Sequence, residues 1–420
     1  MGPPLEILIV ADDLTGAADT AVQFCPVLGP VLLVGPGAIA GALAEIDAAA
    51  IARFTHSRHL KPAAAARQVE AALQGLAPQQ VYKKIDSCLR GNPGVEIEAL
   101  MGASGATASF VAPALPSQGR TTINDIHQVD GVPLAESEIG RDPLCPLAES
   151  CLSANLAGQC RLPVGHIDLT CIDSGTDAMA RKVQRLLNDG CRHIAFDALH
   201  GRHLDTIVAL AQERFPHILL AGSAGLAASL ARYMGRTMAR TPAHLEQAAR
   251  PNITSWLWVC GSASSVLAQQ AAALARATGW PRRMLDPLAL SAPQEISSSE
   301  DWIMEQAQPW SAEGLILGIQ PKPAQGAAAD PDRVVQGLAK LAIILLAKGK
   351  PQGIFLSGGD TAQAVWQQAG ASALKVEEEI LPGLVLGRFW GGAFSGLPVV
   401  TKAGAFGETD SLIELVKLLT

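Results

Sequence analysis

Short apolar runs alternate with polar turns and amphipathic stretches along most of the chain. The run Leu5–Val10 ends at two adjacent aspartates, and the next stretch, Thr15–Phe24, has its apolar residues at helical spacing. The same succession predicts strands at Val31–Val34, Ala50–Phe54, Gln80–Ile85, Phe110–Ala114, His193–Ala198 and Ile218–Ala221, and helices at Ala38–Ala48, Ala63–Leu76, Ala178–Leu187, Asp205–Arg214 and Leu226–Met234. Such alternation is typical of a parallel sheet flanked by helices, with ligands at the carboxyl ends of the strands.

The pattern changes in two places. Thr121–Val164 is irregular and rich in Pro, Gly and Asp, which predicts an elaborated loop with a β-ribbon, and Gly235–Asn252 is polar and marks a domain boundary near residue 240. A second series follows, with strands at Trp256–Cys260, Gly314–Leu317, Gly353–Leu356 and Pro398–Lys402 and helices at Ser265–Ala277, Pro331–Ala347 and Thr361–Ala369. We therefore expect two α/β domains, residues 1–240 and 241–420, each a mostly parallel sheet flanked by helices, with a ligand cleft between them.

Composition narrows the classes of function. Of 420 residues, 49% are hydrophobic and 4% aromatic, and 32 basic against 39 acidic residues give a net charge of −7. A nucleic-acid binder would need a basic face, and a disordered chain would need fewer apolar residues. The uncharged stretch Thr20–Ala44 is interrupted by prolines and glycines, which excludes a membrane span. We expect neither nucleic acid nor a membrane as a partner, whereas a homo-oligomer is compatible with the sequence.

The eight cysteines predict reduced thiols. They form no Cys-x-x-Cys pair, and no secretory signal precedes the first predicted strand. Reduced thiols are typical of cytoplasmic proteins, so we expect a cytoplasmic enzyme.

The pair Asp12-Asp13 is the first candidate for chemistry. Two carboxylates at a strand end, facing a helix N-terminus, suit hydroxyl binding, general-base work or metal coordination. One of them could instead cap the helix that follows. Because a cap rarely needs two carboxylates, we expect a functional role for at least one.

A second cluster brings two cations, a carboxylate, a hydroxyl and a thiol to another predicted strand end: Lys84, Asp86, Ser87, Cys88 and Arg90. Lys84 and Arg90 suit a carboxylate or phosphate ligand, since a guanidinium binds oxyanions bidentately. In the structural alternative, the two cations pair with Asp12 or Asp86. Cys88 has no recognisable His partner, so we interpret it as a packing residue rather than a nucleophile.

Two further arginines follow predicted strands. Arg58 comes soon after Ala50–Phe54 and is a candidate anion ligand. Arg120 lies in the turn Pro113–Thr122, which could close over the same site or serve only as a structural turn.

In the second half, glycine and hydroxyl clusters follow the strands in place of charged ones. They are Gly261-Ser262-Ala263-Ser264, Ser357-Gly358-Gly359-Asp360-Thr361 and Lys402-Ala403-Gly404-Ala405-Phe406-Gly407. Backbone amides at such turns and helix N-termini bind phosphate. One such turn is weak support, but three in one domain indicate a nucleotide.

Two familiar nucleotide motifs give no stronger alternative. The sequence contains no Walker-type P-loop. Gly35–Ala40 matches the dinucleotide pattern Gly-x-Gly-x-x-Ala, but Pro36 lacks a donor N–H and the next strand ends without an acidic residue for a ribose. We interpret this segment as a turn, while an NAD-dependent dehydrogenase of small hydroxy acids stays open as an alternative.

The motifs together resemble those of the four-carbon acid sugar kinases. The similar segments, in the same order and over nearly the whole chain, are Ile9–Thr20, Lys84–Gly91, Pro113–Thr122, Gly358–Thr361 and Gly404–Gly407. The Asp-Asp-Leu-Thr-Gly form looks more like the threonate and erythronate kinases than the 3-oxo-tetronate branch, where Phe commonly replaces Leu14. The family usually has Thr at the position of Cys88, so this chain lacks one hydroxyl donor and the substrate stereochemistry stays open.

The resemblance implies a tetronate-binding domain at 1–240, an ATP-binding domain at 241–420 and phosphorylation of the 4-hydroxyl, with D-threonate as the first candidate and erythronate the next. It implies ATP as co-substrate and Mg²⁺ with it, without naming metal ligands. A non-catalytic sugar-acid sensor is a further alternative.

The residues that this interpretation assigns fall into three groups. Asp12 or Asp13 would orient or deprotonate the attacking hydroxyl. The substrate-binding residues would be Asp12, Arg58, Lys84, Asp86, Ser87, Cys88, Leu89 and Arg90. The nucleotide site would be Ser262, Ser264, Gly358, Gly359, Asp360, Thr361, Gly404 and Gly407.

Overall fold

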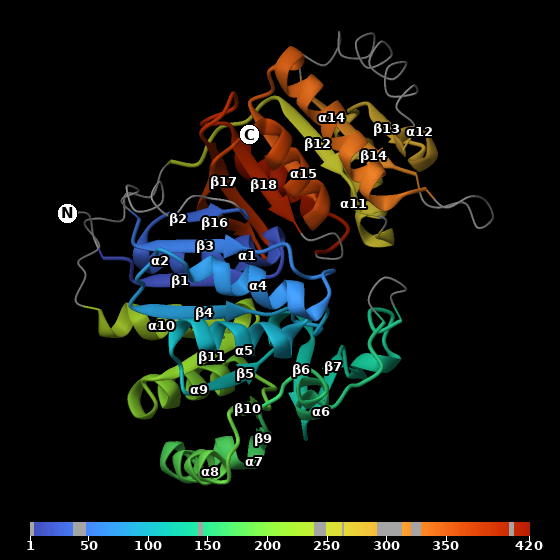
Figure 1. The fold of residues 1–420 in the computed structure, drawn as a ribbon. Helices are drawn as coiled ribbons and strands as arrows, with labels where there is room; N and C mark the ends of the chain where they lie inside the picture. Colours follow the sequence, from blue (N-terminus) through green and yellow to red (C-terminus); the bar gives the residue numbers. More distant parts are fainter. Residues whose placement is uncertain are drawn as a thin grey trace. The chain divides into compact units, whose positions relative to one another are not determined.

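The chain divides into two compact units, Met1–Glu246 and Gln247–Thr420, in a computed structural model (Figure 1). The structure describes residues 4–36, 48–141, 146–238, 249–262, 264–291, 313–320, 329–402 and 407–420. The boundary that the sequence predicts at residue 240 lies outside these ranges, as does nearly all of the predicted helix Ala38–Ala48. Each unit is described by itself.

The N-terminal unit is built on a parallel sheet with the order β2-β3-β1-β4-β11-β5-β10-β9. Its strands are β1 (Ile7–Ala11), β2 (Val31–Val34), β3 (Ala50–Phe54), β4 (Gln80–Lys84), β5 (Ala108–Ala112), β9 (Val164–Ile167), β10 (His193–Phe196) and β11 (Ile218–Gly222). Most of these strands are buried along their whole length, which explains why the sequence shows them as continuous apolar runs rather than as alternating ones. The predicted parallel α/β fold is confirmed for this unit.

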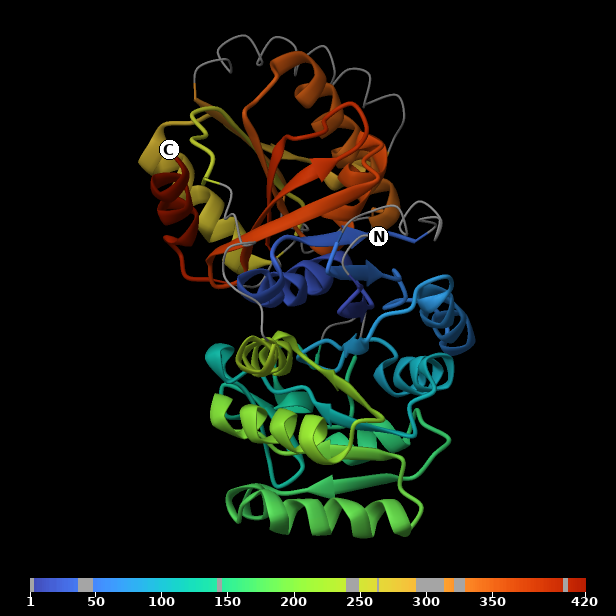
Figure 2. The same ribbon diagram turned by 90° about the vertical axis from the view of Figure 1, so that its left-hand side faces the viewer.

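Helices cover both faces of this sheet (Figure 2). A helix that connects two parallel strands makes a right-handed crossover. The face of the sheet on which the helix lies therefore depends on whether the second strand lies to one side or the other of the first. The helices α1 and α9 follow steps in one direction and α4 and α5 steps in the other, and α4 packs on α5 while α9 packs on α10. The helices are α1 (Leu14–Ala21), α2 (Cys25–Leu28), α4 (Pro62–Leu73), α5 (Pro93–Ser104), α6 (Leu152–Ala157), α7 (Leu169–Asp173), α8 (Thr176–Asn188), α9 (Gly201–Arg214) and α10 (Ala224–Thr237), with short 3-10 turns at Val22–Phe24, Pro116–Gln118 and Leu134–Glu136.

The predicted β-ribbon is present as a small antiparallel sheet of β6 (Arg120–Ile123), β7 (Ile126–Val129) and β8 (Val132–Pro133). Helix α6 follows it and was not predicted. Helix α5 was also missed, because its apolar residues are spread around the helix and no single face stands out in the sequence. Pro93 occupies its first turn, where a proline costs no hydrogen bond.

The C-terminal unit contains a mixed sheet with the order β13-β14-β12-β15-β18-β17-β16. Five strands are parallel: β12 (Trp256–Cys260), β13 (Arg282–Leu285), β14 (Gly314–Ile319), β15 (Gly353–Ser357) and β18 (Pro398–Lys402). The hairpin β16 (Ala373–Leu381) and β17 (Leu384–Trp390) pairs antiparallel with β18. The sequence analysis did not predict this hairpin, since three consecutive glutamates in β16 are poor strand formers, and its pairing with β18 is what fixes it.

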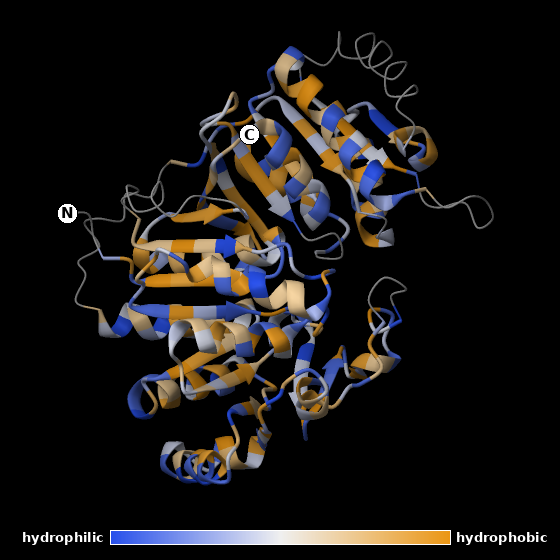
Figure 3. Ribbon diagram, in the orientation of Figure 1, coloured by the Kyte–Doolittle hydropathy of each residue, from blue (hydrophilic) through white to orange (hydrophobic). Residues whose placement is uncertain are grey.

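Helices α11 (Ser265–Thr278), α12 (Pro287–Ser291), α14 (Pro331–Gly349), α15 (Gly359–Ala369) and α16 (Ser411–Leu419) accompany this sheet. Its core contains a cluster of aromatic rings, with Trp258 stacked 4.4 Å from Phe355 and 6.1 Å from Trp280 between ring centroids. Figure 3 shows the strands of both units mostly in hydrophobic colours, whereas the outer helix α8 is largely hydrophilic. Within the described residues, no helix has the length and apolar character that a bilayer span requires.

Gly222 shows how closely the strands and helices of the N-terminal sheet pack. A Cβ at this position would lie 2.5 Å from the carbonyl oxygen of Ala112 and 2.7 Å from the side chain of Leu226. We expect Gly222→Ala to destabilise the protein by about 1–3 kcal/mol, because a backbone carbonyl in a sheet cannot move aside. Urea unfolding measures this as a lower transition midpoint.

The matched control is Gly102→Ala, in helix α5, where a Cβ would meet nothing within 4 Å. We expect this variant to be stabilised by about 0.5–1 kcal/mol, since alanine is the better helix former. Equal midpoints for the two variants would contradict the steric argument.

Candidate functional site

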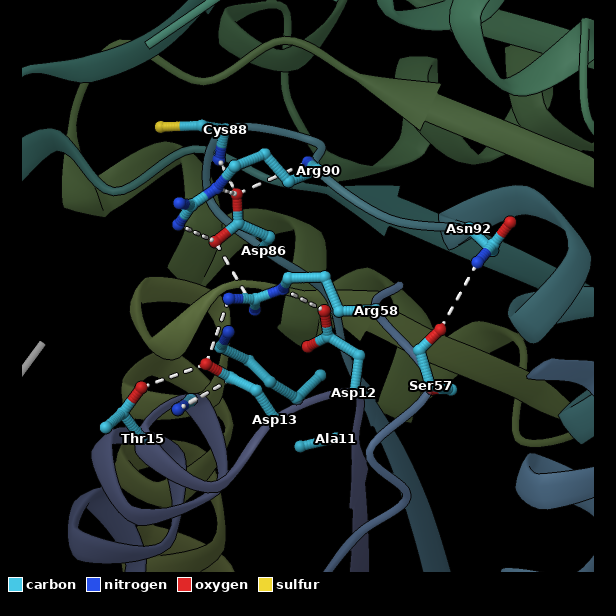
Figure 4. Close-up of polar contacts among 12 residues, drawn as sticks. Ala11, Asp12, Asp13, Thr15, Ser57, Arg58, Asp86, Cys88, Arg90 and Asn92 are labelled. Carbon is cyan, nitrogen blue, oxygen red and sulfur yellow. Dashed lines mark hydrogen bonds and ion pairs between the residues drawn. The ribbon is translucent and has the colours of Figure 1, made fainter. Parts of the chain in front are cut away.

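Three polar clusters that are far apart in the sequence meet at one edge of the N-terminal sheet (Figure 4). Strands β3, β1 and β4 are parallel neighbours, so their carboxyl ends lie side by side. Asp12 and Asp13 follow β1, Arg58 follows β3, and Asp86–Arg90 follow β4. The structure thus brings together the first-half residues that the sequence analysis had selected from separate turns.

Arg58 binds all three aspartates. Its Nε donates to Asp12 at 2.7 Å, its Nη1 donates to Asp13 at 2.9 Å, and its Nη2 lies 3.6 Å from Asp86. Every nitrogen of the guanidinium therefore faces a carboxylate of the protein. The role of Arg58 as an anion ligand stays a prediction. Of the two cations for which the sequence left pairing with Asp12 or Asp86 open, Arg90 pairs with Asp86.

The two adjacent aspartates have different environments. Asp13 caps helix α1: its Oδ1 accepts from the backbone N–H of Gly16 at 2.9 Å, and its Oδ2 accepts from Thr15 Oγ1 and from Arg58. Asp12 uses Oδ2 for Arg58, whereas its Oδ1 is buried and has no hydrogen-bond partner among the described residues. A buried carboxylate oxygen without a donor is costly, so Asp12 Oδ1 is the acceptor that a ligand hydroxyl would satisfy.

The segment Asp86–Gly91 wraps around the carboxylate of Asp86. The backbone N–H groups of Cys88 and Arg90 donate to Oδ2 at 3.1 and 3.3 Å, and the Arg90 side chain donates through Nε and Nη2 at 2.9 Å each. Leu89 takes a left-handed conformation with φ 59°, which is unfavourable for a side chain of this size, and is fully buried. Leu89 thus helps to close the turn around Asp86.

The positive charges in this cluster lower the pKa values of Asp12 and Asp86. Burial alone raises the pKa of Asp86, but Arg90 and Arg58 outweigh it and hold the pKa well below its usual value. Burial likewise raises the pKa of Asp12, and Arg58 and Lys84 reverse the shift, so that this pKa is also lowered. The pKa of Arg58 is raised well above its usual value because the three aspartates outweigh its burial.

Lys84 and Arg90 are the cations best placed for an anionic ligand. Lys84 is buried, and its Nζ forms no hydrogen bond or ion pair with another side chain in the part of the chain that the structure describes. A Cβ at Gly16 would lie 2.8 Å from Lys84 Nζ, so the ammonium lies at the N-terminal turn of α1, where the helix dipole also attracts anions. Nη1 of Arg90 is likewise not used by its pairing with Asp86.

Ser87 and Cys88 lie at the same strand end, and both are buried. Burial, and then the nearby Asp86, raise the pKa of the Cys88 thiol, although Arg120 opposes this. A thiol with a raised pKa is a poor nucleophile, in agreement with the interpretation of Cys88 as a packing residue. Arg120 from the predicted turn Pro113–Thr122 thus reaches the same cluster.

The sequence analysis missed a buried layer beneath the site. Lys83 forms an ion pair with Glu96 at 2.7 Å, and Glu96 also accepts from Ser57 Oγ at 2.6 Å. Side chains alternate along a strand, so Lys83 and Lys84 point to opposite faces of the sheet. Two adjacent lysines in a strand therefore indicated that Lys83 needs a buried partner. The sequence could not identify this partner as Glu96, because helix α5, which carries Glu96, was not predicted.

His127 is a second missed residue. It lies in the ribbon strand β7, where its Nε2 donates to the carbonyl oxygen of Ser87 at 2.7 Å and its Nδ1 accepts from Thr122 Oγ1 at 2.9 Å. It is fully buried and thereby joins the ribbon to the Asp86 segment. Burial lowers the pKa of His127 to about 4.

The glycine-rich turns of the C-terminal unit also converge. Cys260 pairs with Ser357 and Ser357 with Lys402 across parallel strands, so the turns after β12, β15 and β18 begin at one sheet edge. A Cβ at Gly261 would clash with the side chain of Thr361, so this close approach favours glycine at position 261. Gly358 has φ 101° and leads directly into helix α15.

The remaining predicted nucleotide residues lie around these turns. Ser262 Oγ accepts from the backbone N–H of Ser264, which precedes helix α11, and Asp360 is exposed in the first turn of α15. The carbonyl oxygen of Gly407 accepts a hydrogen bond from Gln270 Nε2 at 2.9 Å. Gly404 lies outside the described residues. The N–H of Gly358 donates to the carbonyl oxygen of Lys402 at 3.2 Å. The N–H groups of Gly359, Asp360 and Thr361 belong to the first turn of α15, where an anion can accept from them.

Lys402 begins one of the three predicted phosphate-binding turns, but the sequence pattern did not mark it as a site residue. It ends β18 beside the turn after β15, and it is almost fully buried. Burial lowers the pKa of Lys402 to about 8. A lysine at a strand end between phosphate-type turns was the signal that could have selected it.

The dinucleotide-like match Gly35–Ala40 has a packing explanation at its first glycine. A Cβ at Gly35 would lie 2.9 Å from the ring of Phe54, so the glycine accommodates this ring. Residues 37–40 lie outside the described part of the chain. The thiols of the described cysteines form no disulfide, as the sequence analysis expected.

Comparison with known proteins divides the chain in the same order. A model of a sugar-binding N-terminal domain matches residues 7–230, and a model of a nucleotide-binding C-terminal domain matches residues 257–412. A D-threonate kinase of Bordetella bronchiseptica is 34% identical, with 100% of this chain and 98% of the relative covered. A D-erythronate kinase of Heliobacterium modesticaldum is 27% identical, with coverages of 98% and 97%.

A solved structure shares the fold over the same extent. The crystal structure of a Salmonella typhimurium LT2 protein, described as a candidate tRNA synthase, is 25% identical and has a TM-score of 0.82, with 98% of each chain covered.

His127 generates a prediction about pH. The folded protein holds this imidazole neutral down to about pH 4, whereas the unfolded chain takes up the proton near pH 6.5. The contribution of His127 to stability is therefore intact at neutral pH and falls as the pH drops from about 6.5 to 4, by on the order of 3 kcal/mol.

We expect the variant His127→Gln to lose this pH-dependent contribution to the free energy of unfolding. Denaturant unfolding from pH 7 to pH 4 would show a shallower loss of stability in the variant than in the unchanged protein. Parallel pH curves for the two proteins would contradict the assignment.

Proposed function

The chain belongs to the four-carbon acid sugar kinase family, and from this premise we propose that it transfers the terminal phosphate of ATP to the 4-hydroxyl of D-threonate. Membership of the family makes it a phosphotransferase that acts on a four-carbon sugar acid. The choice of D-threonate rests on the 34% identity to the Bordetella bronchiseptica enzyme over the full chain. Erythronate is the next candidate.

The unsatisfied Oδ1 of Asp12 carries the proposal. It is a buried acceptor at a strand end, and the groups around it would suit a small hydroxylated anion. We assign Asp12, rather than Asp13, as the residue that orients the attacking hydroxyl, since both oxygens of Asp13 are engaged in capping α1 and binding Arg58.

The lowered pKa of Asp12 indicates what it does to the hydroxyl. A carboxylate with a lowered pKa can accept a hydrogen bond from the hydroxyl, but it takes up the proton only late in the reaction. Phosphoryl transfer passes through a loose transition state, in which the alcohol needs to be aligned more than deprotonated in advance. Asp12 would therefore align the hydroxyl and receive its proton as the new P–O bond forms.

Lys84 and Nη1 of Arg90 would hold the carboxylate of the sugar acid. They are the cationic groups of the cluster that its own aspartates leave available. Asp86 and Ser87 would contact the inner hydroxyls, whereas Arg58 would hold the three aspartates in place. The buried Cys88 offers less hydrogen bonding than a threonine, which bears on the stereochemistry of the hydroxyl it faces.

The C-terminal unit would bind ATP through the backbone N–H groups of the first turn of α15, from Gly359 to Thr361, with the buried Lys402 beside them. Gly358 would provide the left-handed turn that leads into this helix. Carboxylate oxygens are the ligands that Mg²⁺ prefers, and the exposed Asp360 at the start of α15 fits this ion. Bound Mg²⁺ would neutralise the phosphate oxygens of the nucleotide.

We expect ADP release that depends on the sugar acid. A coupled assay with ATP and Mg²⁺ over a panel of four-carbon acids should give the highest kcat/KM with D-threonate. Activity with another tetronate only would change the substrate and keep the reaction. No turnover with any acid, together with tight NADH binding by fluorescence, would favour the dehydrogenase, and acid binding without turnover would favour the sensor.

Asp12→Asn should lower kcat by roughly 10²-fold or more, because the variant keeps its shape but loses the charged acceptor. Asp13→Asn is the matched control and should lower kcat less, since its amide oxygen can still accept from Gly16. Circular dichroism would verify that both variants fold. A larger loss in Asp13→Asn would exchange the two roles.

Lys84→Met should raise the KM for the sugar acid by about tenfold or more, because a charge-assisted hydrogen bond is lost. The KM for ATP should change little, since Lys84 belongs to the N-terminal unit. Arg232→Met, at an exposed arginine of helix α10, is the control for a lost positive charge. An effect on ATP alone would overturn the assignment of the substrate domain.

A further inference from the structure

A second cluster of ligand-type side chains lies at the opposite edge of the N-terminal sheet. Glu98 comes from helix α5, Cys160 from the segment after α6, and His193 is the first residue of β10. One oxygen, the thiol sulfur and one ring nitrogen of these residues all lie within 4.8 Å of one another. Because His193 begins its strand, the cluster is at the amino ends of the strands, away from Asp12 and its neighbours.

Glu98 and His193 lie at a spacing that is compatible with a shared metal ion. His193 Nε2 lies 3.3 Å from Glu98 Oε1, which is long for a hydrogen bond between an imidazole and a carboxylate. In a tetrahedral zinc site with bonds of about 2.0–2.1 Å to nitrogen and oxygen, two such ligand atoms are about 3.3 Å apart. The two side chains, which this contact joins directly, are thus close enough for one ion to bind both.

Neighbouring groups orient each ligand. Ser109 Oγ lies 2.8 Å from His193 Nδ1, which leaves Nε2 to face the cluster. The backbone N–H groups of Arg161 and Leu162 each donate to Glu98 Oε1 at 2.7 Å, whereas Oε2 accepts no hydrogen bond from the described residues. A hydroxyl on the far nitrogen of a ligating histidine and hydrogen bonds to a ligating carboxylate are typical of metal sites.

The thiol is also placed for a metal. A Cβ at Gly94 would lie 2.8 Å from Cys160 Sγ, so the sulfur packs on the first turn of α5, where the helix dipole favours a thiolate.

We propose that Glu98, Cys160 and His193 bind one Zn²⁺ ion, with water as the fourth ligand. A thiolate, an imidazole and a carboxylate together favour zinc over magnesium or calcium, which prefer oxygen ligands only. Binding forms a Zn–S bond and releases the thiol proton to solvent. The ion would link three segments that are distant in the sequence.

The test uses the full-length protein after removal of metals with a chelator. Titration with Co²⁺, which replaces zinc in such sites, should saturate at one ion per chain and give a thiolate-to-cobalt charge-transfer band that Zn²⁺ abolishes. Zinc should also raise the thermal unfolding midpoint. No stoichiometric uptake, or uptake without the thiolate band, would overturn the proposal.

Variants identify the ligands. Cys160→Ser should lose the cobalt band, while Cys171→Ser, at another partly buried cysteine outside the cluster, should keep it. Ser109→Ala should weaken zinc binding by about tenfold, as expected when the partner of a ligating histidine is removed. A band that persists in Cys160→Ser would reject the site.

A measurement on the unchanged protein covers the case in which Cys160→Ser does not fold. Zn²⁺ should protect Cys160, and not Cys171, from alkylation, as read by mass spectrometry of the peptides. Equal protection of both cysteines, or of neither, would overturn the proposal. None of these readouts depends on kinase activity, so the outcome is independent of the function proposed above.

Discussion

The contact of one guanidinium with three carboxylates is the interaction on which the N-terminal site depends. Asp12, Asp13 and Asp86 would repel one another at this distance, and burial alone would raise the pKa values of Asp12 and Asp86. Arg58 bridges all three, and Arg90 and Lys84 bring the count of positive charges to three as well. The cluster is therefore balanced and can stay ionised while buried. It leaves one carboxylate oxygen, on Asp12, without a donor.

The order of the strands makes this contact possible. Arg58 and Asp86 lie tens of residues from Asp12 in the sequence, yet β1 is paired on one side with β3 and on the other with β4. Parallel pairing brings the turns after these strands to one edge. The buried ion pair of Lys83 and Glu96 is joined to the segment of Arg58 by the hydrogen bond from Ser57 to Glu96. His127 holds the Asp86 segment by its hydrogen bond to the carbonyl oxygen of Ser87.

The two units offer anion sites of different chemical kinds. In the N-terminal unit the cations Lys84 and Arg90 lie among carboxylates, an arrangement suited to a ligand that carries both a charge and hydroxyl groups. In the C-terminal unit the first turn of α15, which follows Gly358, offers backbone N–H groups, with Lys402 as a buried cation nearby. The net charge of −7 conceals this difference, because buried cations count in the sum but do not contribute to the surface.

The sequence by itself determined the parallel α/β architecture, since buried parallel strands leave continuous apolar runs and each run ends in a polar turn. It also selected Asp12, Lys84 and Asp86, because those turns carry the charged residues. It could not predict helix α5 or the hairpin of β16 and β17, whose residues have no clear period of their own and are fixed by packing and by pairing with β18. Only the tertiary structure decided which aspartate caps the helix and which keeps a vacant oxygen, and that Arg58 holds the aspartates together. Those distinctions depend on distances between residues that the chain separates, which no local pattern records.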